Sequence, residues 1–135
     1  MDFTAAFVDK RHMSALSNTP TNTHMPQAIA VVIVAAGKSS RIRQATPKQF
    51  LELCGKPVLC HSFDIFATHA RVVDIVIVGP ADNLASVKHA LGVERIGDNR
   101  LQVIAGGETR QSSVKAGLAV LSRSKARLVS IHDAA

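Results

Sequence analysis

The 135-residue chain is long enough for one domain with a hydrophobic core, and its 47% hydrophobic and 19% charged fractions are typical of a globular protein. The formal net charge of +6 suits an anionic partner, but the absence of Trp and Tyr argues against the base-stacking surfaces of single-stranded nucleic-acid binders. The longest apolar run, Ile29 to Ala36, is too short to cross a bilayer as a helix, which takes about 20 residues, so we expect neither nucleic acid nor membrane as a partner.

The N-terminal segment differs in composition from the rest. Residues 1–26 are rich in Ser, Thr, Asn and Pro and show no hydrophobic period, which predicts a disordered extension before a domain at 27–135. The two cysteines, Cys54 and Cys60, fit neither a zinc site nor a redox motif. We expect them to be reduced thiols in a cytoplasmic protein.

Strands and helices alternate from Ala28 onward. The continuous β-branched run Ile29–Ala35 predicts a strand buried on both faces. A polar loop follows it to about Gln49, and a helix opens at Pro57, with Leu59, Phe63 and Phe66 at helical spacing. Further along the chain we expect strands at Val72–Val78, Leu101–Ala105 and Leu128–Ile131, and helices carrying Leu84, Val87 and Leu91, and then Val114, Gly117, Leu118 and Leu121.

This β-α-β-α-β-α-β order predicts a three-layer α/β/α domain with a parallel sheet and right-handed crossovers. Ligands of such sheets bind beyond the carboxyl ends of the strands. The segments Gly37–Lys48, Gly106–Ser113 and Asp133–Ala135 leave strand ends and carry unusual polar chemistry, so we expect one site formed by all three. A domain of this type usually has further strands that cover its edge, so we expect either that the chain is a fragment or that a partner covers the edge of the last strand.

The loop after the first strand has the chemistry of an anion site. Gly37 allows a tight turn whose following amides can face an anion, and Lys38, Arg41 and Lys48 add positive charge. A solvated basic loop is the competing interpretation. A P-loop is excluded because Val32 stands where its first glycine belongs, and the Rossmann fingerprint fails because Ser39 and Ser40 are not glycine.

Four motifs in order resemble those of the methylerythritol-phosphate cytidylyltransferases, which belong to the nucleotide-diphospho-sugar transferase type. They are Ala35-Ala36-Gly37-x-x-x-Arg41, Pro47-Lys48-Gln49-Phe50, Gly106-Gly107-Glu108-Thr109-Arg110-Gln111-Ser112-Ser113-Val114 and His132-Asp133-Ala134-Ala135. The resemblance covers about residues 28–135 and implies a Rossmann-like, mostly parallel sheet, of which this chain holds the N-terminal part and is incomplete at the C-terminus.

The resemblance implies transfer of CMP from CTP to 2-C-methyl-D-erythritol 4-phosphate, with diphosphate released. Arg41 and Lys48 match the catalytic cations of the family, and Asp133 matches its Mg²⁺ ligand. The nucleotide-binding positions implied are Ala35, Ala36, Gly37, Lys38, Gly106, Gly107, Glu108, Ser113 and Ala134. Ser113 would bond the cytosine carbonyl, and Arg110 is a candidate charge partner for its loop.

Two alternatives remain open from the sequence. A cytidylyltransferase for another polyol phosphate, such as ribitol 5-phosphate, shares Pro-Lys-Gln-Phe, although Ala134-Ala135 favours methylerythritol phosphate. An inactive nucleotide-binding fragment of the family is the second, because the family's acceptor-binding residues and dimerisation arm lie mostly beyond the position of Ala135. For the complete protein the resemblance implies a homodimer.

Overall fold

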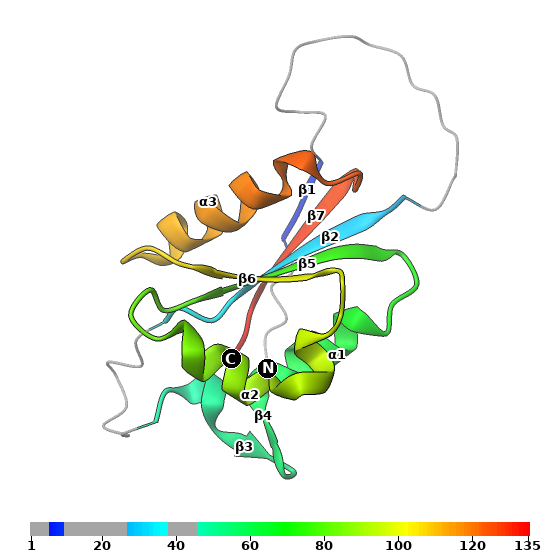
Figure 1. The fold of residues 1–135 in the computed structure, drawn as a ribbon. Helices are drawn as coiled ribbons and strands as arrows, with labels where there is room; N and C mark the ends of the chain where they lie inside the picture. The colour runs from blue at the N-terminus through cyan, green and yellow to red at the C-terminus, as the bar shows by residue number, and fades with distance from the viewer. Residues whose placement is uncertain (1–5, 10–26, 38–45) are drawn as a thin grey trace, which may run out of the picture.

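The computed structural model describes residues 6–9, 27–37 and 46–135, and it places a mostly parallel sheet between two layers of helices (Figure 1). The sheet contains β1 (Ala6–Asp9), β2 (Ile29–Val34), β5 (Val72–Gly79), β6 (Leu101–Ala105) and β7 (Leu128–Asp133). The helices are α1 (Val58–Ala67), α2 (Leu84–Ile96) and α3 (Arg110–Val120), with short 3-10 turns at η2 (Lys48–Phe50) and η3 (Leu121–Arg123).

The sheet has the order β1-β7-β2-β5-β6, and every pairing among β2, β5, β6 and β7 is parallel. The α/β class, the parallel sheet and the three layers predicted from the sequence are therefore confirmed. Val34 at the end of β2 pairs with Asp133 on one side and with Val78 on the other. Gly79 pairs with Ala105, so the four parallel strands end at one edge of the sheet.

The central strand β2 is buried on both faces, which explains its unbroken apolar sequence. Val31 and Ile33 lie in the cluster that packs against α1 and α2, whereas Val32 and Val34 lie in the cluster beneath α3. Figure 1 shows these helices on opposite sides of the sheet. Alternate side chains of one strand thus enter two separate cores.

The predicted helical stripes face these cores. Leu59 and Phe63 of α1 are buried, as are Val87 and Leu91 of α2. In α3, a Cβ atom on Gly117 would lie 2.6 Å from a methyl carbon of Val32, so the glycine allows close approach to the sheet. These contacts hold each helix against the sheet.

The prediction that residues 1–26 form a disordered extension needs correction for four of them. Ala6–Asp9 forms β1, which pairs antiparallel with β7 in a register from Ala6 opposite Ile131 to Asp9 opposite Leu128. β1 pairs with the backbone N–H and C=O groups along the outer edge of β7. The edge of this strand is thereby covered within the chain itself. The remaining residues of the segment lie outside the described ranges.

A small hairpin between η2 and α1 was also not predicted. It joins β3 (Glu52–Leu53) to β4 (Lys56–Pro57) through Cys54 and Gly55, whose φ angles are 53° and 73°. Two successive positive φ values are those of the type I′ turn that suits a two-residue hairpin loop. Where a polar loop was expected to run to about Gln49, the chain instead forms η2 over Lys48–Phe50.

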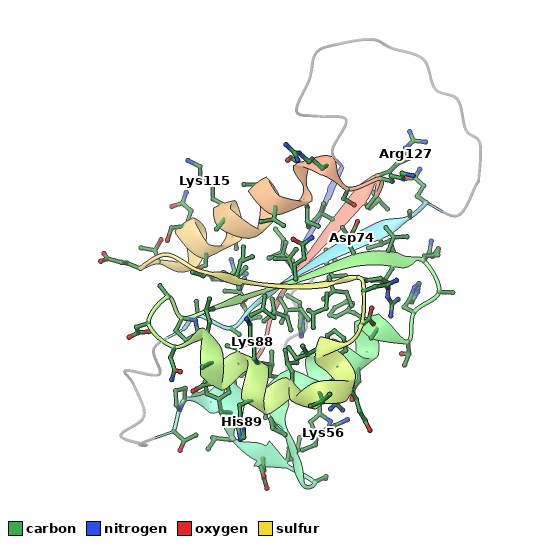
Figure 2. The ribbon with its side chains drawn as sticks, viewed as in Figure 1. Lys56, Asp74, Lys88, His89, Lys115 and Arg127 are labelled. Carbon is green, nitrogen blue, oxygen red and sulfur yellow. The ribbon has the colours of Figure 1, made fainter. Side chains whose placement is uncertain are left out.

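Within the described ranges, basic side chains lie on both sides of the sheet (Figure 2). Lys115 and Arg127 lie on the α3 side of the sheet, whereas Lys88 and His89 lie on α2 at the opposite side. No helix within the described ranges combines the length and apolar character that crossing a membrane demands.

An ion-pair network joins α1, α2 and the hairpin. Arg95 donates to both oxygens of Asp64, from Nε at 2.8 Å and from Nη2 at 2.9 Å, and Lys56 Nζ lies 2.7 Å from Oδ2. These hydrogen bonds, those of Arg95 first, lower the pKa of Asp64 from 3.8 to about 2. The carboxylate is therefore favoured in the folded state.

Asp64→Asn should lower the free energy of unfolding at pH 7 by about 1–2 kcal/mol, since charge-assisted hydrogen bonds are lost at a partly exposed site. A carboxyl group whose pKa is lower in the folded state stabilises the protein at any pH above its pKa in the unfolded state. This stabilisation is lost as the pH falls through the pKa of the folded state. The free energy of unfolding measured by urea denaturation should thus differ less between wild type and Asp64→Asn as the pH falls from 4 to about 2. A constant difference over that range would contradict this role, and Asp82→Asn at an exposed position is the matched control.

Candidate functional site

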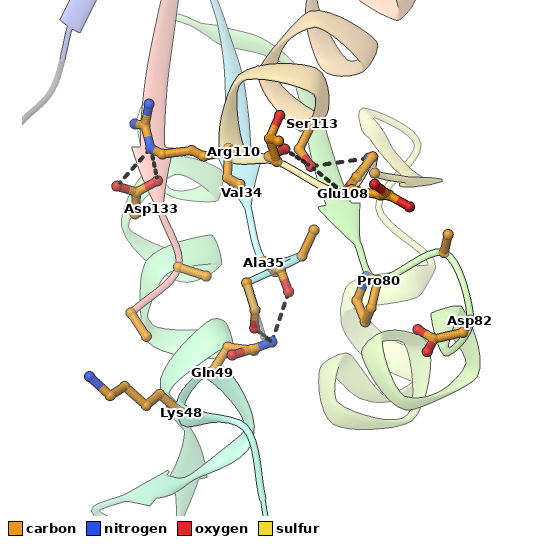
Figure 3. Close-up of a pocket in the computed structure, with 18 residues that line it drawn as sticks. Val34, Ala35, Lys48, Gln49, Pro80, Asp82, Glu108, Arg110, Ser113 and Asp133 are labelled. Atoms are coloured by element: carbon orange, nitrogen blue, oxygen red, sulfur yellow. Dashed lines mark hydrogen bonds and ion pairs between the residues drawn. The ribbon is translucent and has the colours of Figure 1, made fainter. Parts of the chain in front are cut away.

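A pocket of about 930 Å³ lies at the carboxyl edge of the sheet (Figure 3). Its walls come from the ends of β2, β5, β6 and β7 and from η2. The lining residues are Val34, Ala35, Ala36, Gly37, Lys48, Gln49, Pro80, Ala81, Asp82, Gly106, Gly107, Glu108, Thr109, Arg110, Ser113, Asp133, Ala134 and Ala135. The place is the one that the parallel topology predicts for a ligand.

The described residues predicted for the site meet in this one pocket. Those that line it are Lys48, Asp133, Ala35, Ala36, Gly37, Gly106, Gly107, Glu108, Ser113 and Ala134. The other two predicted positions, Lys38 and Arg41, lie outside the described residues. Segments separated by up to about a hundred positions in the sequence are thus brought to one cleft by the fold.

Backbone hydrogen bonds continue past the end of β2 and fix the first wall. The amide of Ala35 donates to Val78 O at 2.8 Å, and the amide of Ala134 donates to Val34 O at 2.9 Å. Lys48 is exposed, and Figure 3 shows it at the opposite end of the pocket from Ser113. A ligand that touches both must therefore extend along the strand ends.

The second wall requires a glycine at its start. The amide of Gly106 donates to Gly79 O at 2.8 Å, which holds the turn after β6 against the end of β5. A Cβ atom at position 106 would lie 2.6 Å from Ser113 Oγ and 2.8 Å from Ala36 Cβ. Because Cβ atoms essentially never show contacts this short, a side chain at position 106 would force the two walls to shift.

Ser113 is 1% exposed, and its hydroxyl holds the turn together. It donates to Thr109 O at 3.0 Å and accepts from the amide of Gly107 at 3.2 Å. Thr109 in turn caps α3 through a capping box with Ser112. The single hydroxyl hydrogen is engaged within the turn, and the contact with a cytosine carbonyl stays a prediction.

Arg110 is a charge partner, as the sequence suggested, and it pairs with Asp133. Its Nε lies 2.9 Å from Oδ1 and 3.2 Å from Oδ2 of that carboxylate (Figure 3). The two side chains are 58% and 51% exposed. Exposed pairs of this kind contribute only about 0–1 kcal/mol, so a cation at Asp133 or a phosphate at Arg110 could replace the partner at small cost.

His132, which begins the fourth motif, packs toward α1 and does not line the pocket. Its ring meets Phe66 edge-on with the ring centroids 5.4 Å apart. Burial lowers the pKa of His132, against a smaller opposite effect of the neighbouring Asp133 charge. Burial thus favours the neutral form of the imidazole, which packs the end of β7 onto α1.

The charges around the pocket suit a cation that arrives with a polyanion. Two cationic side chains, Lys48 and Arg110, and three carboxylates, Asp82, Glu108 and Asp133, line its described part. Among the described residues no cluster of three or more His, Cys, Asp or Glu could hold a metal ion. Mg²⁺ is commonly bound through one or two carboxylates plus substrate phosphates and water, and Asp133 fits that kind of site.

Pro80 and Asp82, which the sequence analysis did not select, form the far wall of the pocket (Figure 3). They lie within three residues of Gly79, the last residue of β5. The same rule about strand ends would have found them. Gln49, in contrast, was quoted within a motif but was given no role.

The family model described as IspD, 2-C-methyl-D-erythritol 4-phosphate cytidylyltransferase, matches residues 29–135. The bifunctional enzyme IspD/IspF of Mesorhizobium japonicum is 38% identical over 120 residues, which are 88% of this chain and 29% of that protein. The 2-C-methyl-D-erythritol 4-phosphate cytidylyltransferase of Leptospira interrogans is 34% identical over 111 residues, which are 82% of this chain and 46% of that protein.

A solved structure carries the same fold. The 4-diphosphocytidyl-2C-methyl-D-erythritol synthase from Anaerococcus prevotii superposes with a TM-score of 0.62 at 24% identity, over 80% of this chain and 43% of that one. At this identity the likeness concerns the fold alone. The chain spans less than half the length of each of these relatives.

Proposed function

Because this chain belongs to the 2-C-methyl-D-erythritol 4-phosphate cytidylyltransferase family, we propose that it carries the nucleotide site for CMP transfer from CTP to 2-C-methyl-D-erythritol 4-phosphate in non-mevalonate isoprenoid synthesis. The observation that supports this is the convergence of four separate motifs on one pocket. A volume of about 930 Å³ is within the range of small-ligand sites.

In the proposed reaction an oxygen of the acceptor phosphate attacks the α-phosphorus of CTP. The new P–O bond forms as the bond to the β-phosphate bridging oxygen breaks, and diphosphate leaves. In such a transfer the protein contributes chiefly by positioning the reactants and by stabilising the negative charge of the transition state. We assign the stabilisation of this charge to the cations Lys48 and Arg41.

The triphosphate would run from the backbone of Ala35–Gly37 toward Lys48, and the base would lie at the turn of Gly106, Gly107 and Ser113. Asp133 would hold Mg²⁺, which would neutralise phosphate charge and orient the triphosphate. Arg110 lines the same pocket, and its guanidinium would bind the phosphates. Each of these placements uses residues that line the same pocket.

The setting of the activity is part of the proposal. We propose that the complete protein works as a cytoplasmic homodimer and that its partners are CTP and a small polyol phosphate, with neither nucleic acid nor membrane involved. Basic side chains on opposite sides of the sheet fit this better than a continuous track for a long polyanion (Figure 2).

An acceptor comparison tests the proposal. The purified protein is mixed with CTP, Mg²⁺ and either 2-C-methyl-D-erythritol 4-phosphate or ribitol 5-phosphate, and diphosphate release is followed. We expect transfer to the first acceptor and little to the second. Preference for ribitol 5-phosphate would overturn the acceptor assignment, and failure both to bind CTP in calorimetry and to release diphosphate would overturn the enzyme assignment.

A further inference from the structure

Buried polar side chains in this structure are concentrated behind the pocket. Of the four in the described part of the chain, three bond to backbone atoms of residues that line it. Ser113 holds Gly107, Ser62 Oγ donates to Ala134 O at 3.1 Å, and Gln49 donates to Ala35 O. Because a polar group is buried only at a cost, its hydrogen bonds point to the backbone that the fold must hold in place.

Gln49 makes the most specific of these connections. It is 5% exposed, and its Nε2 lies 2.8 Å from Ala35 O and 3.4 Å from Gly37 O (Figure 3). Both carbonyls follow the end of β2, beyond the ladder with β5 and β7. The side-chain amide of Gln49 therefore holds the backbone of Ala35 and Gly37, which lie fourteen and twelve residues earlier in the chain. This backbone begins the loop that the sequence predicts to bind an anion.

The same turn carries Lys48. Two backbone bonds close it, from Phe50 N to Pro47 O at 2.9 Å and from Leu51 N to Lys48 O at 3.1 Å. In a 3-10 turn successive side chains point about 120° apart, so the direction of the buried Gln49 fixes the direction in which Lys48 leaves the backbone. Gln49 faces inward and Lys48 is exposed toward the pocket.

We propose that Gln49 is a positioning residue, which ties the turn of Lys48 to the backbone of Ala35 and Gly37 so that both act on the phosphates of one bound nucleotide. This inference rests on the proposed function, because it assigns Gln49 its effect through Lys48. A flexible lysine contributes to a transition state only when it is held at the correct distance, and a displacement of about 1 Å can cost up to ~100-fold in rate.

Gln49→Met is the direct test, because methionine has a similar length and is apolar but has no hydrogen to donate. We expect turnover at saturating CTP to fall about 10-fold while KM for CTP changes less than about 3-fold, since the effect falls on the reacting geometry. Hydrogen exchange of the Phe50 and Leu51 amides should become faster, because the turn loses its anchor.

A double-mutant cycle separates positioning from general destabilisation. In the Lys48→Ala background, Gln49→Met should lower turnover by less than about 2-fold further, because the cation that it positions is absent. The matched control is Cys60→Ala, which removes a buried side chain that donates to Ala90 O at 3.0 Å and does not line the pocket. It should lower thermal stability and leave turnover close to that of wild type.

Three outcomes would overturn the inference. They are unchanged turnover in Gln49→Met, multiplicative losses in the double variant, and unchanged exchange of the Phe50 and Leu51 amides. Measurements on the wild-type protein distinguish failure of the positioning role from failure of the proposed function. If the wild type neither binds CTP nor releases diphosphate, both the proposed function and the positioning role of Gln49 are rejected. If it is active and the cycle is multiplicative, the positioning role alone is rejected.

Discussion

Lys48→Ala should lower turnover at least ~100-fold while CTP affinity changes much less. Lys48 lines the pocket at the end opposite to Ser113 (Figure 3). An ammonium placed where charge develops stabilises the transition state more than the bound substrate, and one such contact can contribute on the order of 3–4 kcal/mol. Single-turnover kinetics with CTP in excess measures the chemical step, and calorimetry measures affinity for CTP.

Two further variants make the Lys48 result interpretable. Lys88→Ala removes the same charge from the exposed face of α2, away from the pocket, and should leave turnover unchanged (Figure 2). Lys48→Arg keeps the charge and changes its reach, and should recover part of the lost rate. Near-normal turnover of Lys48→Ala would remove this residue from the mechanism. An equal loss of turnover in Lys88→Ala would show that the loss comes from the change in net charge and not from the position of Lys48.

The main strands and helices could be predicted because each carries a signal in its own residues. Ile29–Val34 is buried on both faces, so every position is apolar, and Val87 and Leu91 recur at the helical period because one face of α2 meets the core. The hairpin carries no such signal. Its strands have two residues each, and its turn places Cys54, not Asn or Asp, at a positive φ.

The site could be located before its internal contacts could be known. Parallel strands end at a common edge, so three polar segments after strand ends had to meet there, and Lys48, Asp133 and Gly106 do line one pocket. The bond from Gln49 to Ala35 O joins residues fourteen positions apart across a turn. No periodicity specifies such a contact, because it depends on where the backbone carbonyl of Ala35 points after the strand.

The N-terminal strand shows a similar limit. Ala6–Asp9 is four residues long and stands in a polar segment, so its own pattern does not identify it as a strand. Without β1, the backbone groups along the outer edge of β7 over Leu128–Ile131 would lack partners in the sheet. An extended segment beside this edge can therefore pair with it, whatever its own sequence pattern. The tertiary structure, rather than local preference, creates the strand.

Gly106→Ala should weaken CTP binding about 30-fold, because the added methyl group acts on both walls of the pocket. Its carbon would lie 2.6 Å from Ser113 Oγ and 2.8 Å from Ala36 Cβ, and both of these residues line the pocket. Overpacking of this kind costs about 1–3 kcal/mol, and about 2 kcal/mol corresponds to ~30-fold in affinity. Titration calorimetry with CTP measures the loss, and thermal unfolding should show a lower midpoint.

Gly97→Ala is the matched control for Gly106→Ala, since Gly97 has a φ of −72° and an added Cβ would meet only backbone oxygens at 3.5 Å. Its affinity for CTP should equal that of wild type. If Gly106→Ala bound CTP normally, the turn after β6 would have to shift without disturbing the nucleotide, and the base could not lie against it. If both variants lost affinity equally, the loss would reflect stability alone. Only a loss confined to Gly106→Ala places the nucleotide between the ends of β2 and β6.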